Sequence, residues 1–197
     1  MFNAIYRGGA PIIADSPALD LSNTIYTPRG HERDGLCTLQ DVVDWLAIIQ
    51  PRLQTGTSRG PGDVTESDLI RIRGLRASMR RLLYSICEGD SPSEADVATV
   101  NAAACLSPQW FQLKLKDGRP ARYRASDSQG IDAVLAALAS DAIDLVGSER
   151  VEDLRTCQAH NCSLLFLKDH PRREWCSPKC GARVRAARAY SRRKTAI

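Results

Sequence analysis

Apolar residues recur at helical spacing through much of the first 150 residues. The longest run lies between Thr65 and Cys87, where about every third or fourth position is apolar. Its apolar stripe consists of Leu69, Ile72, Leu75, Met79, Leu82, Leu83 and Ile86. Thr65 is a typical N-cap residue, and Gly89 is typical of the position just after a helix. The pattern therefore predicts a long amphipathic helix from about Thr65 to Cys87.

Four shorter stretches favour helices as well. One begins at the N-cap Thr38 and stops at Pro51, and another begins with Ser91-Pro92 and runs to about Cys105. Pro17 to Thr27 is expected to form a short opening helix. Gln129 to about Gly147 is rich in Ala and Leu and is expected to bury one face. The first part of the chain is therefore predicted to be mainly helical.

One stretch shows the alternation of a strand instead. Apolar and polar residues alternate from Trp110 to Lys116, which predicts a strand. Asp117-Gly118 is a turn signal, and Arg119 to Ala125 is expected to be the returning strand. Pro120 lacks an N–H and so places its strand at an edge. The polar stretches from Thr27 to Gly35 and from Gln54 to Asp63 are expected to be loops. We therefore predict an α+β fold, with a helical domain over residues 1–150 that carries a small β-hairpin.

Charge divides the chain at nearly the same place. The 197 residues carry a net charge of +4, and 43% apolar residues are enough for a real core. Residues 1–156 carry −4 and residues 157–197 carry +8. No apolar stretch has the length of a signal peptide or a membrane span, so we expect a cytoplasmic protein without membrane contact. The basic tail points to a polyanionic partner.

Four of the seven cysteines lie within 24 residues. Cys157 and Cys162 form one pair, and Cys176 and Cys180 form the other. In a reducing compartment this pairing favours a metal site over a disulfide framework, and four thiolates suit tetrahedral Zn²⁺. The set leaves no ligand position for water, so we predict one structural zinc ion. His160 and His170 lie nearby but are expected at the surface.

The residues between the cysteines predict a small β-and-helix module. We expect strands at Val151 to Leu154 and at Leu164 to Leu167, with a turn at Asp169 to Arg173. Ser177-Pro178 signals a helix start, which puts Cys180 in the first turn. Residues 151–197 are therefore predicted to form a treble-clef-like zinc ribbon with a basic helix at its end.

This segment resembles the CGNR-type zinc finger. The matching positions are Cys157, Cys162, Phe166, Asp169, Arg173, Trp175, Cys176, Ser177, Cys180, Gly181 and Arg183. The preceding residues resemble the ABATE domain, through Ala18 to Thr24, Asp44 to Leu46, Leu75 to Leu83 and Val100 to Ala104. The resemblance implies a stress-induced transcription regulator. One position departs from the pattern: Ala182 stands where the motif has Asn, which puts any role of that Asn in doubt.

The residues after Cys180 favour nucleic-acid binding. On a helix, Arg185, Arg188 and Arg192 share one face and can follow a phosphate backbone. The full set expected to contact nucleic acid, DNA rather than RNA, is Arg172, Arg173, Lys179, Arg183, Arg185, Arg188, Arg192 and Arg193. The simpler alternative is a solvated basic helix that forms ion pairs with the acidic body. The alternative function is a protein-interaction module in which zinc is purely structural.

The helical domain offers one further hypothesis. Asn23, Trp45, Arg76 and Asn101 stand in the matching body motifs and could line a pocket for a small ligand, although caps, core packing and ion pairs would explain them too. A homodimer would also suit a regulator. No phosphate-binding loop or nucleophile motif is present, so an enzyme is not expected.

Overall fold

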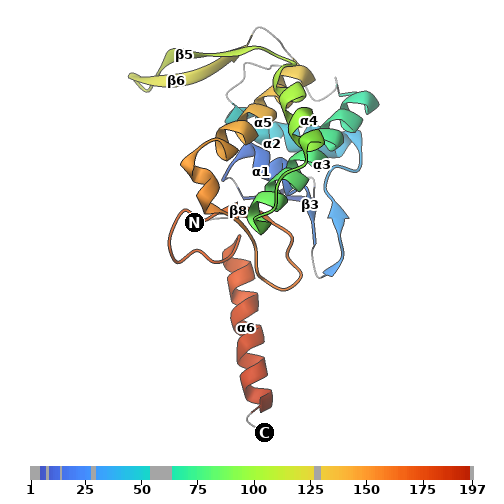
Figure 1. Cartoon of the computed structure of the whole chain (residues 1–197), viewed down its shortest axis with the longest axis vertical. Coiled ribbons are helices and arrows are strands. Elements are labelled where there is room, and N and C mark those ends of the chain that lie inside the picture. Colours follow the sequence, from blue (N-terminus) through green and yellow to red (C-terminus); the bar gives the residue numbers. More distant parts are fainter. Residues whose placement is uncertain are drawn as a thin grey trace.

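The computed structural model describes residues 5–7, 9–13, 15–27, 30–53, 64–126 and 130–195. Five helices pack into one body around a shared apolar core (Figure 1). They are α1 (Pro17–Ser22), α2 (Leu39–Leu53), α3 (Glu66–Glu88), α4 (Glu94–Ala104) and α5 (Ile131–Val146). Trp45 of α2 and Met79 of α3 are fully buried in this core. The predicted helical domain is confirmed.

The ends of α3 follow the local signals. The Thr65 hydroxyl accepts a hydrogen bond from the Asp68 N–H, and the Asp68 carboxylate accepts one from the Thr65 N–H. This reciprocal pair satisfies amides that have no partner inside the helix. Gly89 ends α3 with a φ of 78°, in the left-handed region that favours glycine.

The predicted hairpin is present as β5 (Gln109–Lys116) paired antiparallel with β6 (Arg119–Ser126). Lys116 pairs with Arg119 across the turn residues Asp117 (φ 52°) and Gly118 (φ 75°). Two consecutive residues with positive φ make the turn whose twist matches a hairpin. The hairpin extends from the end of the body that lies opposite α6 (Figure 1).

Short strands appear where the sequence predicted helix or loop. The opening helix ends at Ser22, and β3 (Ile25–Tyr26) then pairs with β4 (Arg33–Asp34) inside the predicted loop. Another unpredicted pair is β1 (Ile5–Arg7) with β2 (Ala10–Ile12). Strands of two or three residues have too few positions to show an alternation, since their pairing partners decide them.

Two helix boundaries also differ from expectation. α2 continues through Pro51 to Leu53 although Pro51 has no N–H to donate, and the buried Leu53 packs this last turn into the core. α4 begins after Ser93 rather than Ser91. The loop predicted at Gln54 to Asp63 lies outside the described residues. The predicted helix start at Gln129 lies outside them too.

The C-terminal part consists of a short hairpin and a long helix. β7 (Leu154–Thr156) pairs antiparallel with β8 (Leu165–Leu167), and α6 (Pro178–Thr195) follows. A single-turn 3-10 helix (Glu149–Asp153) occupies most of the strand predicted at Val151 to Leu154, so the strand starts later than expected. With helices and short antiparallel strand pairs in both parts, the described chain is α+β.

Among the described residues, no helix combines the length and apolar character needed to cross a membrane.

Candidate metal centre

The first cysteine pair is positioned by the β7–β8 hairpin. Cys157 follows β7 directly, and its N–H donates to the Leu164 carbonyl at 2.9 Å, which continues the ladder of β7 and β8. Cys162 lies in the connecting loop, where its N–H donates to the Ala159 carbonyl at 3.0 Å. Asn161 has a positive φ of 56°, so the chain reverses sharply just before Cys162. This turn brings the second thiol back toward the first.

The second pair is positioned by the start of α6. The Ser177 hydroxyl accepts a hydrogen bond from the Cys180 N–H at 3.3 Å, and Pro178 is the first helical residue. Ser177 therefore caps the helix as its sequence indicates. Cys176 precedes this cap and Cys180 lies in the first turn, so both thiols are near the positive end of the helix dipole.

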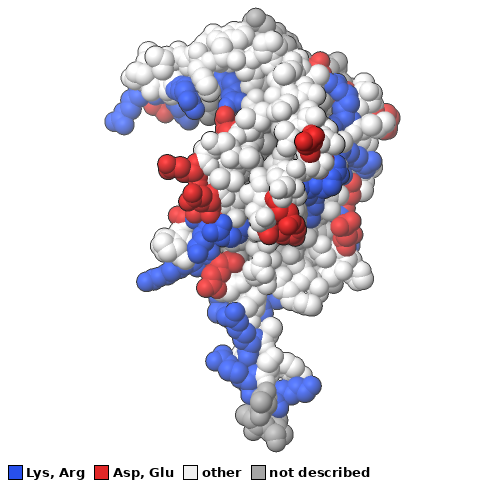
Figure 2. Space-filling model, in the orientation of Figure 1, with Lys and Arg blue, Asp and Glu red and all other residues white. Residues whose placement is uncertain are grey.

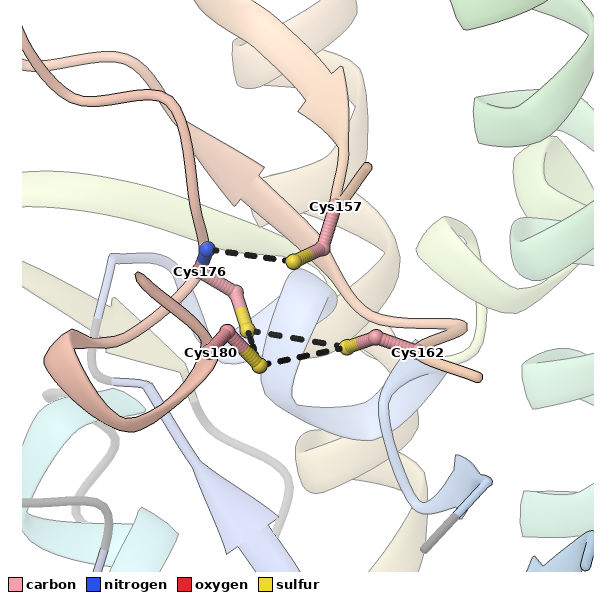
Figure 3. A group of neighbouring side chains, drawn as sticks. All are labelled: Cys157, Cys162, Cys176 and Cys180. Atoms are coloured by element: carbon pink, nitrogen blue, oxygen red, sulfur yellow. Dashed lines mark hydrogen bonds between the residues drawn. The ribbon is translucent and has the colours of Figure 1, made fainter. Parts of the chain in front are cut away.

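The four sulfur atoms form a compact group (Figure 3). All lie within 4.8 Å of one another. Cys176 Sγ is 3.7 Å from Cys162 Sγ and 3.6 Å from Cys180 Sγ, and Cys180 Sγ is 3.8 Å from Cys162 Sγ. Four sulfurs at about 2.3 Å from a central Zn²⁺ form a tetrahedron with edges of about 3.8 Å. The cluster thus fits one structural zinc ion.

Electrostatics also favours a cation at this point. Hydrogen bonds from Cys162 and Cys176 lower the pKa of Cys157 to about 7. The same network lowers the pKa of Cys180 and raises the pKa of Cys162 and Cys176. Four thiolates this close repel one another, so the thiols cannot all ionise by themselves. A divalent cation removes this repulsion, which is why zinc binding releases protons.

Residues after Cys180 support the cluster. Arg183 donates to Cys180 Sγ at 3.6 Å, which places a positive charge beside a ligand sulfur. Gly181 packs against Trp175, and a Cβ at Gly181 would come within 3.1 Å of the Trp175 ring. Ala182, at the position of the motif's Asn, is exposed, and its methyl group is not a metal ligand. The Ala182 substitution is therefore compatible with the cluster.

The module is joined to the body through the backbone of β8. The Asn23 side chain donates to the Leu165 carbonyl at 2.9 Å and accepts from the Leu165 N–H at 2.8 Å. Leu154 and Leu167 are part of the same buried cluster as the helices of the body. The hairpin that carries the first two cysteines therefore shares a core with the helical domain.

A second joint uses Asp15 and Arg173. Asp15 accepts from the Leu167 N–H at 2.8 Å and from Arg173, whose side chain is only 9% exposed. Arg173 also pairs with Asp169 and lies over the Phe166 ring. We predicted Arg173 as a nucleic-acid contact; the structure shows its side chain nearly buried and paired within the protein, and the contact with nucleic acid stays a prediction. Its guanidinium is held between the finger and the body, because two carboxylates and a ring face surround it.

The four residues of the predicted ligand pocket lie in different environments. Asn23 bonds to β8, Trp45 is fully buried with its indole N–H unpaired, and Asn101 is exposed on α4. Arg76 is buried and donates to both carboxylate oxygens of Asp34 at 2.5 and 2.7 Å. Burial raises the pKa of Asp34, but its hydrogen bonds and the neighbouring arginines outweigh this effect and lower it. The structure thus shows protein partners for Asn23 and Arg76, and the small ligand stays a prediction.

The other predicted contacts remain at the surface. Arg172, Lys179, Arg183, Arg185, Arg188, Arg192 and Arg193 are all exposed, six of them on α6. His31, His160 and His170 are exposed as expected. The sequence missed Asp15, whose role depends on residues more than 150 positions away.

Comparison with known proteins agrees with the two parts. Residues 15–149 match the ABATE family, described as a "putative stress-induced transcription regulator". Residues 154–193 match the CGNR zinc finger. Comparison with curated proteins gives no match. Since the first match covers more than half of the chain, the protein belongs to the ABATE family and carries a CGNR zinc finger after its ABATE domain.

Proposed function

We propose that this protein is a zinc-dependent transcription regulator that binds nucleic acid through α6 and the adjacent finger. The observation that carries the proposal is the projection of α6 away from the body (Figure 1). Seven of its 18 residues are Lys or Arg, and none is acidic. Positive side chains line the helix in the space-filling view (Figure 2). The arrangement of two β-hairpin cysteines and two helix-start cysteines also supports a treble-clef-like finger.

The geometry of α6 suits a phosphate backbone. Arg185, Arg188 and Arg192 recur every three or four residues, and all are exposed. Like charges at this spacing destabilise an isolated helix by about 0.2–0.5 kcal/mol per pair, and phosphates would relieve that repulsion. Binding would also release counterions from the nucleic acid.

The shape of α6 supports DNA over RNA. An α-helix with its side chains is about 10–12 Å wide, close to the width of the B-form major groove. The major groove of A-form RNA is deep and narrow, and side chains cannot read it. On this proposal the ABATE domain senses a ligand or dimerises, and no residue has a catalytic role.

The test is a salt series of duplex DNA binding with zinc-loaded full-length protein. We expect the affinity to fall steeply between about 50 and 200 mM salt. Replacing Arg185, Arg188 and Arg192 by Gln should reduce the log–log slope by about 2–3. The matched control replaces three surface arginines of the helical domain outside the β5–β6 hairpin, Arg33, Arg71 and Arg81, by Gln and should leave the slope nearly unchanged. Absence of binding at low salt, or equal effects of both triple variants, would refute the proposal.

A further inference from the structure

The β5–β6 hairpin exposes an unusual number of large apolar side chains. Phe111 is 54% exposed, Leu113 79% and Leu115 77%. These residues alternate along β5 and therefore share one face. Directly opposite them in the register are Arg124, Arg122 and Pro120, which point to the same face. One face of the hairpin is thus apolar along β5 and basic along β6.

This hairpin is held by contacts between its own strands, such as Arg122 over the Phe111 ring, and by its root on the body. In the described part of the structure, β5 and β6 form a two-stranded sheet with no third strand. Two-stranded hairpins are marginal in water, and contiguous exposed apolar residues usually mark an interaction surface. Its turn and register are nevertheless regular, so the hairpin is a formed element. These features are typical of an arm that packs on a partner.

Beneath the apolar face lies a hollow in the body. It encloses about 710 Å³ and is bounded on the hairpin side by Phe111, Arg122 and Arg124. The body contributes Ile143, which is 41% exposed, and Asp144. Arg124 already pairs with Asp144 at 2.5 Å, so the root of the hairpin is fixed over α5. The hollow is large enough to take several side chains of another chain.

Charge differs between the hairpin and the body surface below it, although the body side of the hollow itself is balanced, with Arg52 and Arg150 beside Asp141 and Asp144. Residues 109–126 carry a net charge of +4, and Arg122 and Arg124 are the two cations that share the apolar face. Residues 131–153 carry six acidic residues and one Arg, a net charge of −5. Figure 2 shows positive side chains along the underside of the hairpin and negative ones on the body below it. Glu149, Glu152 and Asp153 are exposed beside the hollow, outside its lining, and we call this surface the acidic wall.

From this complementarity we infer that the hairpin is a dimerisation arm whose partner is a second copy of this chain. Each arm enters the hollow of the other copy, with Phe111, Leu113 and Leu115 packed together and Arg122 against the acidic wall. The exchange is reciprocal and closes under two-fold symmetry. A nucleic acid fits the surface less well, since the acidic wall repels phosphates and two exposed leucines gain nothing from them. This inference gives a location to the dimerisation and does not depend on nucleic-acid binding.

The test compares the oligomeric state of two double variants by sedimentation equilibrium, with zinc-loaded full-length protein. Leu113→Thr with Leu115→Thr keeps strand propensity but removes the apolar side chains, and should raise the dimer dissociation constant about 100-fold. Ile70→Thr with Leu106→Thr is the matched control, since both residues are exposed elsewhere at 69% and 40%. It should leave the dissociation constant unchanged. Circular dichroism and zinc content establish that each variant is folded.

The contrary outcomes are distinct. A protein that is monomeric at about 100 μM, or a dimer that the leucine pair does not affect, overturns the inference. So does a monomer whose leucine pair is needed for binding DNA or for co-sedimentation with phosphatidylserine-containing vesicles. The variant with Gln in place of Arg185, Arg188 and Arg192 should dimerise normally. The Leu113→Thr, Leu115→Thr variant should still bind DNA, with the slope of log affinity against log salt that a single copy of the chain gives. Failure of one proposal is therefore distinguishable from failure of the other.

Discussion

Two basic elements project from opposite ends of the body, and they differ in what accompanies the charge. In α6 the cations are separated mostly by small residues, and Tyr190 is the large exposed apolar residue within the described part of this helix. In the β5–β6 hairpin Arg124 and Arg122 stand opposite Phe111 and Leu113, and Leu115 lies on the same face. A charged surface without apolar side chains suits a solvated polyanion, whereas an apolar surface must be covered. Positive charge alone therefore does not identify the partner of either element.

The two projections are also anchored differently. α6 begins at the thiol cluster, so its position depends on Cys176 and Cys180. The hairpin is fixed at its root by Arg124 to Asp144 and by the hydroxyl contact of Ser107 with Ser126. Loss of metal should therefore affect one projection much more than the other.

The largest expected effect comes from Cys176→Ser. Structural zinc supplies about 10–16 kcal/mol of binding free energy in finger peptides, and loss of one thiolate should remove most of it. We expect loss of the bound zinc and of hydrogen-exchange protection in α6, with protection in β5–β6 retained. β7 and β8 share the body core, so the body should also lose some stability.

Cys105→Ser is the matched control for this change. Cys105 is exposed and lies outside the cluster, so its variant should keep the zinc and the protection of α6. Retention of one zinc per chain by Cys176→Ser would contradict the assignment of the ligands.

A smaller effect is expected from Asn23→Ala. This change leaves the buried N–H and C=O of Leu165 without their partner, and each unsatisfied group costs about 1–3 kcal/mol. The free energy of unfolding should fall by about 3 kcal/mol in denaturant titrations. The amide hydrogens of β8 should exchange faster, while those of the β5–β6 hairpin should not. Asn101→Ala, at an exposed helical position, serves as control and should change stability little. Equal effects of the two substitutions would show that Asn23 does not join the two parts.

The smallest effect is expected from Gly118→Ala. Gly118 has a φ of 75°, a conformation that costs an L-residue about 1–2 kcal/mol, although its Cβ would meet no neighbour within 4 Å. Hydrogen exchange in β5–β6 should speed up and dimerisation weaken, with α6 and the zinc content unaffected. The same substitution at Gly74, inside α3 and also without neighbours, should instead stabilise the protein by up to about 1 kcal/mol. A weakened α6 after Gly118→Ala would mean that the two projections are not independent.

Local patterns determined much of this protein. The helix start at Thr65, the turn at Asp117-Gly118 and the helix start at Ser177-Pro178 all formed as their sequences predict. The spacing of the four cysteines indicated a zinc cluster, and their sulfurs converge. Each of these signals acts within a few residues of itself, so it is complete in the sequence.

The tertiary structure decided the long-range pairings. Asn23 reaches a backbone position 142 residues away, and Arg173 is paired with Asp15. The sequence shows that these side chains are polar, but only packing selects their partners. For the same reason, the position of the hairpin above an acidic wall, with its leucines exposed, could not be read from its alternating pattern. The partner of a side chain depends on where distant elements pack, whereas the start of a helix or the shape of a turn depends on its neighbours.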